Sequence, residues 1–202
     1  MLAGMLAAPL APAFAQFRVE VSGVGLTQLP IAIAPFRGEE QSPQKISAIV
    51  RADLERSGQF RGVDASGVPL DETSHPDVSA WRQKGADSLA VGSVTLLADG
   101  RFDVRFRLWD VVRGQDLGGQ SYTVVAGDLR LAAHRIADYI YQKLTGDRGI
   151  FSTRIAYITK NGGRYTLWVA DSDGENAQAA LASSEPIISP AWAPNGRELA
   201  YV

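Results

Sequence analysis

The sequence predicts an α/β domain, in which helices pack on a mixed sheet, followed by the first blade of an all-β propeller. Helical and alternating apolar spacings interchange over residues 30–146, as is typical of an α/β domain. Only strand patterns and turns follow residue 150. Residues 153–158 are also similar to residues 197–202, and their apolar cores, which start at residues 155 and 199, lie 44 residues apart. A propeller blade repeats about every 40–45 residues, so this spacing predicts successive blades.

The composition is that of an ordinary globular protein, and it excludes several classes. The 202 residues are 46% hydrophobic and 21% charged. The formal net charge of -2 argues against a protein that holds nucleic acid by neutralising phosphates, and against a polybasic membrane binder. Zero cysteines exclude disulfides, thiolate metal sites and cysteine nucleophiles. Outside the first residues, no apolar run reaches the roughly 18 residues of a membrane helix.

Residues 1–15 have most features of an export signal. They are apolar and uncharged, and they end in Ala13-Phe14-Ala15, a sequence typical of a signal peptidase site. The positively charged region that should precede the apolar run is missing, and the first cation is Arg18. We expect a signal peptide and a mature extracytoplasmic chain from Gln16, the alternative being a buried strand or helix.

Residues 16–29 would form the mature N-terminus. Apolar and polar side chains alternate there in the pattern of a half-buried strand. Such a strand either joins the sheet of its own domain, which the pattern alone favours, or pairs with the edge of a partner's sheet. The alternating residues are Phe17, Arg18, Val19, Glu20 and Val21.

Residues 30–146 predict, in order, strand, helix, strand, short helix, three antiparallel strands and a long helix. Ser42-Pro43 predicts the N-cap and first position of a helix that ends at Ser57-Gly58. Gly85 and Gly146 are expected to end the two later helices. The expected strands span 30–36, 60–63, 88–97, 101–108 and 120–125, and the later helices span 77–84 and 129–144.

Residues 147–150 are predicted to be a linker, and residues 151–202 the first propeller blade and the start of the second. Strands are expected over 153–158, 165–170 and 177–182. Turn sequences separate them at Asn161-Gly162-Gly163 and Asp171-Ser172-Asp173-Gly174. A lone blade cannot bury both of its faces, so we expect further blades outside these residues and interpret the chain as a fragment.

The histidines and serines do not assemble a hydrolase signature. No G-x-S-x-G motif is present, and Ser66 and Ser121 are expected to be turn or strand serines. His75 lies in a predicted loop. His134 and Asp138 are four residues apart on the long helix, so they could pair as base and orienter. Because no nucleophile completes that unit, we expect a surface ion pair instead.

The charged clusters do not predict a metal, phosphate or nucleic-acid site. Three alternating acids resemble part of a calcium loop, but the twelve-residue pattern with its terminal glutamate is incomplete. Gly23-Val24-Gly25 lacks the third glycine of a phosphate loop. The basic strand face is interrupted by an aspartate and is expected to be solvated. These clusters are Asp171, Asp173 and Glu175, and Arg101, Arg105 and Arg107.

Several stretches resemble the TolB family, in the same order along the chain. Residues 133–146 resemble the last helix of the family's N-terminal domain, and residues 31–36 and 50–60 fit its first strand and helix. Residues 151–157 resemble the opening of the family's propeller. The run SPAWAPNG at residues 189–196 is similar to its S-P-x-W-S-P-D-G blade motif.

This resemblance implies a non-enzymatic adaptor of the Tol-Pal system in the periplasm, with a six-bladed propeller and no cofactor or metal. It implies that the propeller binds the lipoprotein Pal and that residues 16–29 bind the C-terminal domain of TolA, switching between docked and released states. The expected protein is a monomer without a transmembrane segment, held at the outer membrane through Pal, and it acts in membrane integrity and cell division. Phe17, Arg18, Val19, Glu20 and Val21 become candidate TolA contacts by strand addition, whereas no Pal contact is assigned.

The alternative is an exported, propeller-containing peptidase of the prolyl-oligopeptidase type, whose hydrolase domain would lie outside these residues. Further repeats of about 43 residues would favour the adaptor. A G-x-S-x-G elbow followed by an aspartate and a histidine would favour the enzyme.

Overall fold

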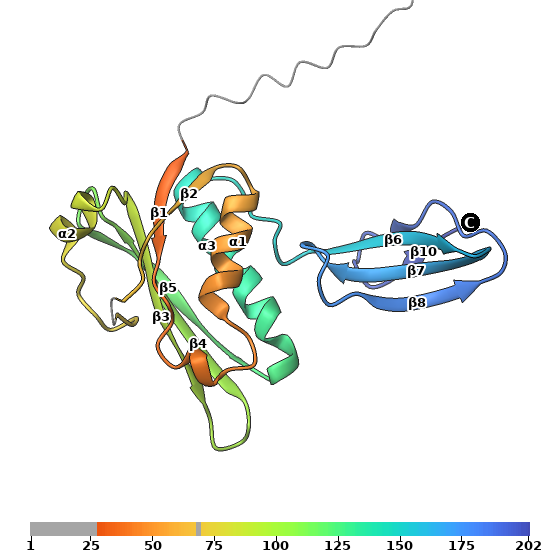
Figure 1. Cartoon of the computed structure of the whole chain (residues 1–202), viewed down its shortest axis with the longest axis horizontal. Helices are drawn as coiled ribbons and strands as arrows, with labels where there is room; N and C mark the ends of the chain where they lie inside the picture. The colour runs from red at the N-terminus through yellow and green to blue at the C-terminus, as the bar shows by residue number, and fades with distance from the viewer. Residues whose placement is uncertain (1–27, 68–69) are drawn as a thin grey trace, which may run out of the picture.

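The computed structural model describes residues 28–67 and 70–202, and it contains two sheet-based parts joined after the long helix (Figure 1). The first part is a five-stranded sheet with helices, and the second is a small all-β unit. This is the fold class that the sequence predicts. The predicted signal peptide at residues 1–15 lies outside the described residues. So does nearly all of the predicted partner-binding segment at residues 16–29, including Phe17, Arg18, Val19, Glu20 and Val21.

The first sheet is mixed, with the strand order β2-β1-β3-β4-β5. β1 runs parallel to both of its neighbours, and β3, β4 and β5 form the expected antiparallel meander. The parallel strands are joined by helical crossovers, as parallel pairing requires. The strands are β1 (Leu29–Ile33), β2 (Phe60–Val63), β3 (Ser88–Leu96), β4 (Phe102–Asp110) and β5 (Gln115–Val124).

Two helices, α1 (Ile46–Arg56) and α3 (Leu129–Thr145), lie side by side and cover one face of this sheet (Figure 1). Their apolar stripes meet the inward side chains of β1 and β4 in one continuous core. Alternation along β4 is as predicted, because every second side chain enters the core. The core residues of these four elements include Ile31, Val50, Leu54, Val104, Phe106, Ile136 and Ile140.

Among the described residues, the opposite face of the sheet is covered in part. Ala32, Leu89 and Val91 pack there with Trp81 of the short helix α2 (Val78–Gln83). Further along, Arg105 projects into solvent beside Asp103, with 2.8 Å between its Nε and the carboxylate. The basic face of β4 is therefore solvated, as expected, and Arg105 on it is also paired with Asp103.

The start of α1 differs from the prediction. Ser42 does not cap this helix, because it follows the short helix η1 (Glu39–Gln41), and Lys45 occupies the N-cap position without a side-chain bond. The buried carboxylate of Glu39 caps the helix instead. It accepts bonds from the N–H of Ser47 at 2.9 Å and from its hydroxyl at 2.6 Å. A carboxylate at a helix N-terminus satisfies free N–H groups and interacts favourably with the helix dipole.

The predicted helix ends are confirmed. Gly146 follows α3 with φ 84°, and its N–H donates to Gln142, which closes the helix. Gly85 has φ 79° beyond the end of α2. Both positions need the left-handed conformation that glycine adopts without strain. No helix in the described ranges is both long and apolar enough to span a membrane.

The second part is a three-stranded antiparallel sheet of β6 (Arg154–Asn161), β7 (Arg164–Asp171) and β8 (Gln178–Ser183), here called the blade sheet. A two-stranded hairpin of β9 (Ala191–Trp192) and β10 (Leu199–Ala200) follows it. The predicted strands and both predicted turns are present. The repeated apolar cores begin within β6 at Ile155 and with β10 at Leu199.

Candidate functional site

A polar junction connects α3 to the turn that follows β7. Arg130 of α3 donates from Nε to Asp171 Oδ2 at 3.2 Å and from Nη2 to Asp173 Oδ2 at 2.5 Å. Its side chain is 18% exposed, and those of the two carboxylates are 15% and 8% exposed. Burial alone would lower the pKa of Arg130, but the bonds to both carboxylates raise it. This arginine therefore stays charged and clamps the blade sheet to the first domain.

His134 lies directly behind this clamp and is completely buried. Its Nδ1 is 2.6 Å from Oδ2 of Asp53 on α1, and the other oxygen of Asp53 accepts from Arg56 at 3.0 Å. The second ring nitrogen, Nε2, is 3.9 Å from an oxygen of Asp171 and from one of Asp173. Those distances exceed a hydrogen bond, and Nε2 has no bonding partner among the described residues.

The expected surface pair of His134 and Asp138 is therefore wrong. His134 belongs to the inward stripe of α3, and its partner is Asp53, which is 81 residues away in the chain. Asp138 instead accepts from the N–H groups of Phe151 at 2.7 Å and Ser152 at 3.1 Å. It fastens the start of the blade region to α3 and does not orient a catalytic base.

The acidic turn after β7 is not built as a calcium loop. Glu175 contributes its backbone: its N–H donates to Asp173 and its carbonyl accepts from Asp171. Burial opposes the charged form of Asp173, but the bonds from the Glu175 N–H and Arg130 lower the pKa of that carboxyl. Asp53, His134 and Asp173 have atoms within 4.8 Å of one another, yet Arg130 and Arg56 already supply the positive charge there. The residues present therefore favour an arginine-bridged junction over a metal site.

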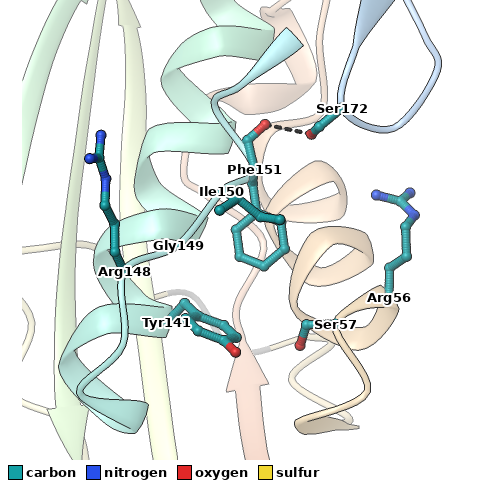
Figure 2. A pocket seen from close by; sticks show the side chains of 8 residues that line it. All are labelled: Arg56, Ser57, Tyr141, Arg148, Gly149, Ile150, Phe151 and Ser172. Carbon is teal, nitrogen blue, oxygen red and sulfur yellow. Dashed lines mark hydrogen bonds between the residues drawn. The ribbon is translucent and has the colours of Figure 1, made fainter. Parts of the chain in front are cut away.

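A cavity of about 350 Å³ opens beside the junction (Figure 2). Its walls come from the end of α1, from α3, from the connection before β6 and from the turn after β7. Ser172 of that turn donates to the carbonyl of Phe151 at 2.6 Å, which ties the blade turn to the cavity wall. The lining residues are Arg56, Ser57, Tyr141, Arg148, Gly149, Ile150, Phe151 and Ser172.

The described chain begins close to this cavity. The side chain of Gln28 donates to the carbonyl of Gly58 at 3.2 Å, and the N–H of Leu29 donates to Gln59 at 2.8 Å. Both acceptors follow Ser57, which lines the cavity. The start of β1 is thus fixed next to the junction.

The other residues considered from the sequence lie away from the junction. Ser66 donates to Asp64 within a turn, and Ser121 lies exposed on the edge strand β5, so both are turn or strand serines as expected. The ring of His75 lies 6.1 Å from that of Trp109, between centroids, on the opposite side of the sheet. The fold places none of these three residues next to His134.

Sequence reasoning missed Asp53 and Arg130. Asp53 precedes Leu54 on the inward stripe of α1, and an acid in an apolar stripe is a detectable signal of a buried pair. Arg130 carries no such signal, because an arginine in the first turn of a helix is usually solvated. Its role depends on where the blade turn lies.

These features define a class of protein, in which an α/β domain is clamped to the beginning of a β-propeller. Residues 17–117 match the family model of the TolB amino-terminal domain, and residues 141–202 match that of the TolB beta propeller domain. The chain therefore belongs to the TolB family.

Curated relatives and a solved structure agree with this assignment. The chain is 77% identical over 190 residues to the Tol-Pal system protein TolB of Polaromonas naphthalenivorans, covering 94% of this chain and 44% of the relative. It is 73% identical over 202 residues to that of Albidiferax ferrireducens, covering 100% and 47%. The crystal structure of TolB from Acinetobacter baumannii superposes with a TM-score of 0.76 at 37% identity, covering 87% of this chain and 44% of that one. The chain thus spans less than half the length of these relatives.

Proposed function

We propose that this chain belongs to a periplasmic adaptor of the Tol-Pal system, which binds proteins and catalyses no reaction. The observation that carries the proposal is the ordered match to both TolB domains, together with relatives that are named Tol-Pal system protein TolB. The junction supports it, because Nδ1 of the buried His134 is engaged by Asp53 and its Nε2 lies 3.9 Å from an oxygen of Asp171 and from one of Asp173. That arrangement suits a structural pair rather than a base for a nucleophile.

The proposed partners divide between the two ends of the protein. The propeller binds Pal, and the mature N-terminus, residues 16–29, adds as a strand to the C-terminal domain of TolA. Phe17, Val19 and Val21 supply side-chain specificity in that pairing, with Arg18 and Glu20 between them. Export by residues 1–15, a monomeric state, peripheral attachment through Pal, and roles in outer-membrane integrity and cell division complete the proposal.

The start of β1 supports a coupling between these two ends. Gln28 and Leu29 are held next to Ser57, and Ser57 lines the same cavity as Ser172 of the blade turn. A docked and a released state of the segment before Gln28 would therefore be sensitive to the position of the blade sheet.

Calorimetric titration of a peptide of residues 16–28 into the TolA C-terminal domain tests the partner site. We expect saturable binding that Phe17→Asp or Val19→Asp abolishes, because each places a charge on the apolar side of the added strand. Ser22→Asp is the matched control, since it adds the same charge on the polar side. Absence of binding at high peptide concentration would contradict the assignment of TolA to this segment.

The same substitution in the whole chain separates binding from folding. Phe17→Asp should weaken TolA binding while the thermal unfolding temperature is unchanged. A lowered unfolding temperature with unchanged TolA affinity would mean that the segment is a strand of its own domain.

A further inference from the structure

The cavity beside the junction has an apolar interior. The rings of Tyr141 and Phe151 meet edge to face, with centroids 5.6 Å apart and planes at 76°. Ile150 completes this surface and is 68% exposed, although it lines a concave site. A volume of about 350 Å³ is at the small end of the range of ligand pockets. The surface therefore suits a small compound with an apolar body.

The charged side chains that line the cavity are all positive. Its lining holds two arginines, Arg56 and Arg148, and no acidic side chain. Arg56 uses Nη1 for Asp53, which leaves its other N–H groups available at a side chain that is 52% exposed. Arg148 forms no ion pair within the described residues. Figure 2 shows the two guanidinium groups on opposite sides of Ile150 and Phe151.

We propose that this cavity binds a small amphipathic carboxylate, with its hydrocarbon chain against Tyr141, Ile150 and Phe151 and its single negative charge at Arg148. Guanidinium groups bind carboxylates through paired, charge-assisted hydrogen bonds, so Arg148 selects an anion over a neutral compound. Ser172 contributes a wall from the blade turn, so the ligand contacts both parts of the protein. This binding is separate from the partner binding proposed above.

Titration of the whole chain with octanoate, followed by amide chemical shifts in NMR spectra, tests the proposal. We expect shift changes to cluster at Ser57, Tyr141, Gly149 and Ser172. Octanol has the same chain without the charge, and it should bind more weakly.

Two variants separate the charge from the apolar surface. Arg148→Gln should weaken octanoate binding about three- to fivefold, the size expected for one exposed charge pair, and leave octanol binding unchanged. Ile150→Ser should weaken both ligands. Arg164→Gln is the matched control: it removes an exposed arginine at the far end of β7 and should have no effect.

Equal affinity for octanol and octanoate, or an Arg148→Gln variant with unchanged octanoate binding, would overturn the proposal. Displacement of octanoate by a peptide of residues 16–28 at lower concentration would show that the chain's own N-terminus is the occupant, and the proposal would be wrong.

Discussion

The first domain and the blade sheet are both built from hydrogen-bonded strands, but within the part of the chain that the structure describes only the first domain encloses a core. Val50, Leu54 and Ile136 are fully buried between the helices and the five-stranded sheet. In the blade sheet only Leu167 and Ala170 are buried to that degree, and Ile155 is 39% exposed. Local pattern therefore suffices to form strands in either region, whereas among the described residues a second layer that buries an apolar core is found on the first sheet.

The two regions also differ in the kind of contact that stabilises them. The first domain depends on apolar contacts, which change little with pH or salt. The blade sheet is attached by charged and hydrogen-bonded contacts of Arg130, Asp138 and the turn at residues 171–173, and Phe151, which precedes β6, packs in the core of the first domain. Charged contacts are weakened by salt and by protonation of the acids. The strength of the junction therefore depends on pH and salt concentration.

The largest loss of stability is expected when the buried pair of Asp53 and His134 is broken. This pair lies in the first domain, directly behind the junction. Asp53→Ala should lower the free energy of unfolding by about 3–5 kcal/mol, because it leaves His134 buried without its partner. Urea unfolding followed by circular dichroism measures this change. Asp64→Ala is the control at an exposed turn and should change stability by about 0.5 kcal/mol or less. A loss below about 1 kcal/mol for Asp53→Ala would mean that the pair contributes little.

Truncating one apolar side chain in each region tests whether the first domain has a buried core and the blade sheet does not. Leu54→Ala should lower the free energy of unfolding by about 2–5 kcal/mol, because its site is fully buried. Leu181→Ala in β8 removes the same atoms from a half-buried site and should cost about 1 kcal/mol or less. Equal losses in urea unfolding would show that the blade sheet has a core of its own.

Removing the clamp should release the blade sheet and spare the first domain. Arg130→Gln loses two charge-assisted bonds, a local effect of roughly 1–3 kcal/mol at this partly buried site. We expect faster amide exchange in β6, β7 and β8 and unchanged exchange in α1 and β3. Arg164→Gln, an exposed arginine on β7, is the matched control. Faster exchange throughout the chain would contradict a separate clamp.

Low pH should weaken the attachment of the blade sheet by less than the loss of Arg130 does. The bonds from the Glu175 N–H and Arg130 outweigh burial and hold the pKa of Asp173 below its ordinary value of 3.8. A lowered folded-state pKa contributes stability above that ordinary value, and the contribution is lost as the pH falls through the folded-state pKa. Amide shifts of the turn, recorded from about pH 6 to about pH 3, should change at the low end only. Arg130→Gln should move that change to higher pH, and an unmoved titration would contradict the pairing.

The sequence predicts most of the fold but little of the junction. Alternation identifies β4, and Gly146 identifies the end of α3, because both signals are local. The sequence predicts a cap at Ser42, because the Ser42-Pro43 pair is a local signal, whereas Glu39 reaches the helix from a separate turn. The sequence suggests Asp138 as the partner of His134, because spacing along one helix is visible in a sequence. A partner on another helix, such as Asp53, is not visible there.

Amide hydrogen exchange across the whole chain tests the central claim, that one region encloses its own core and the other is held to it by a polar clamp. We predict slow exchange in β1, β3 and α3 and markedly faster exchange in β6, β7 and β8. Protection across residues 151–202 that is uniform and equal to that of the first domain would contradict the account.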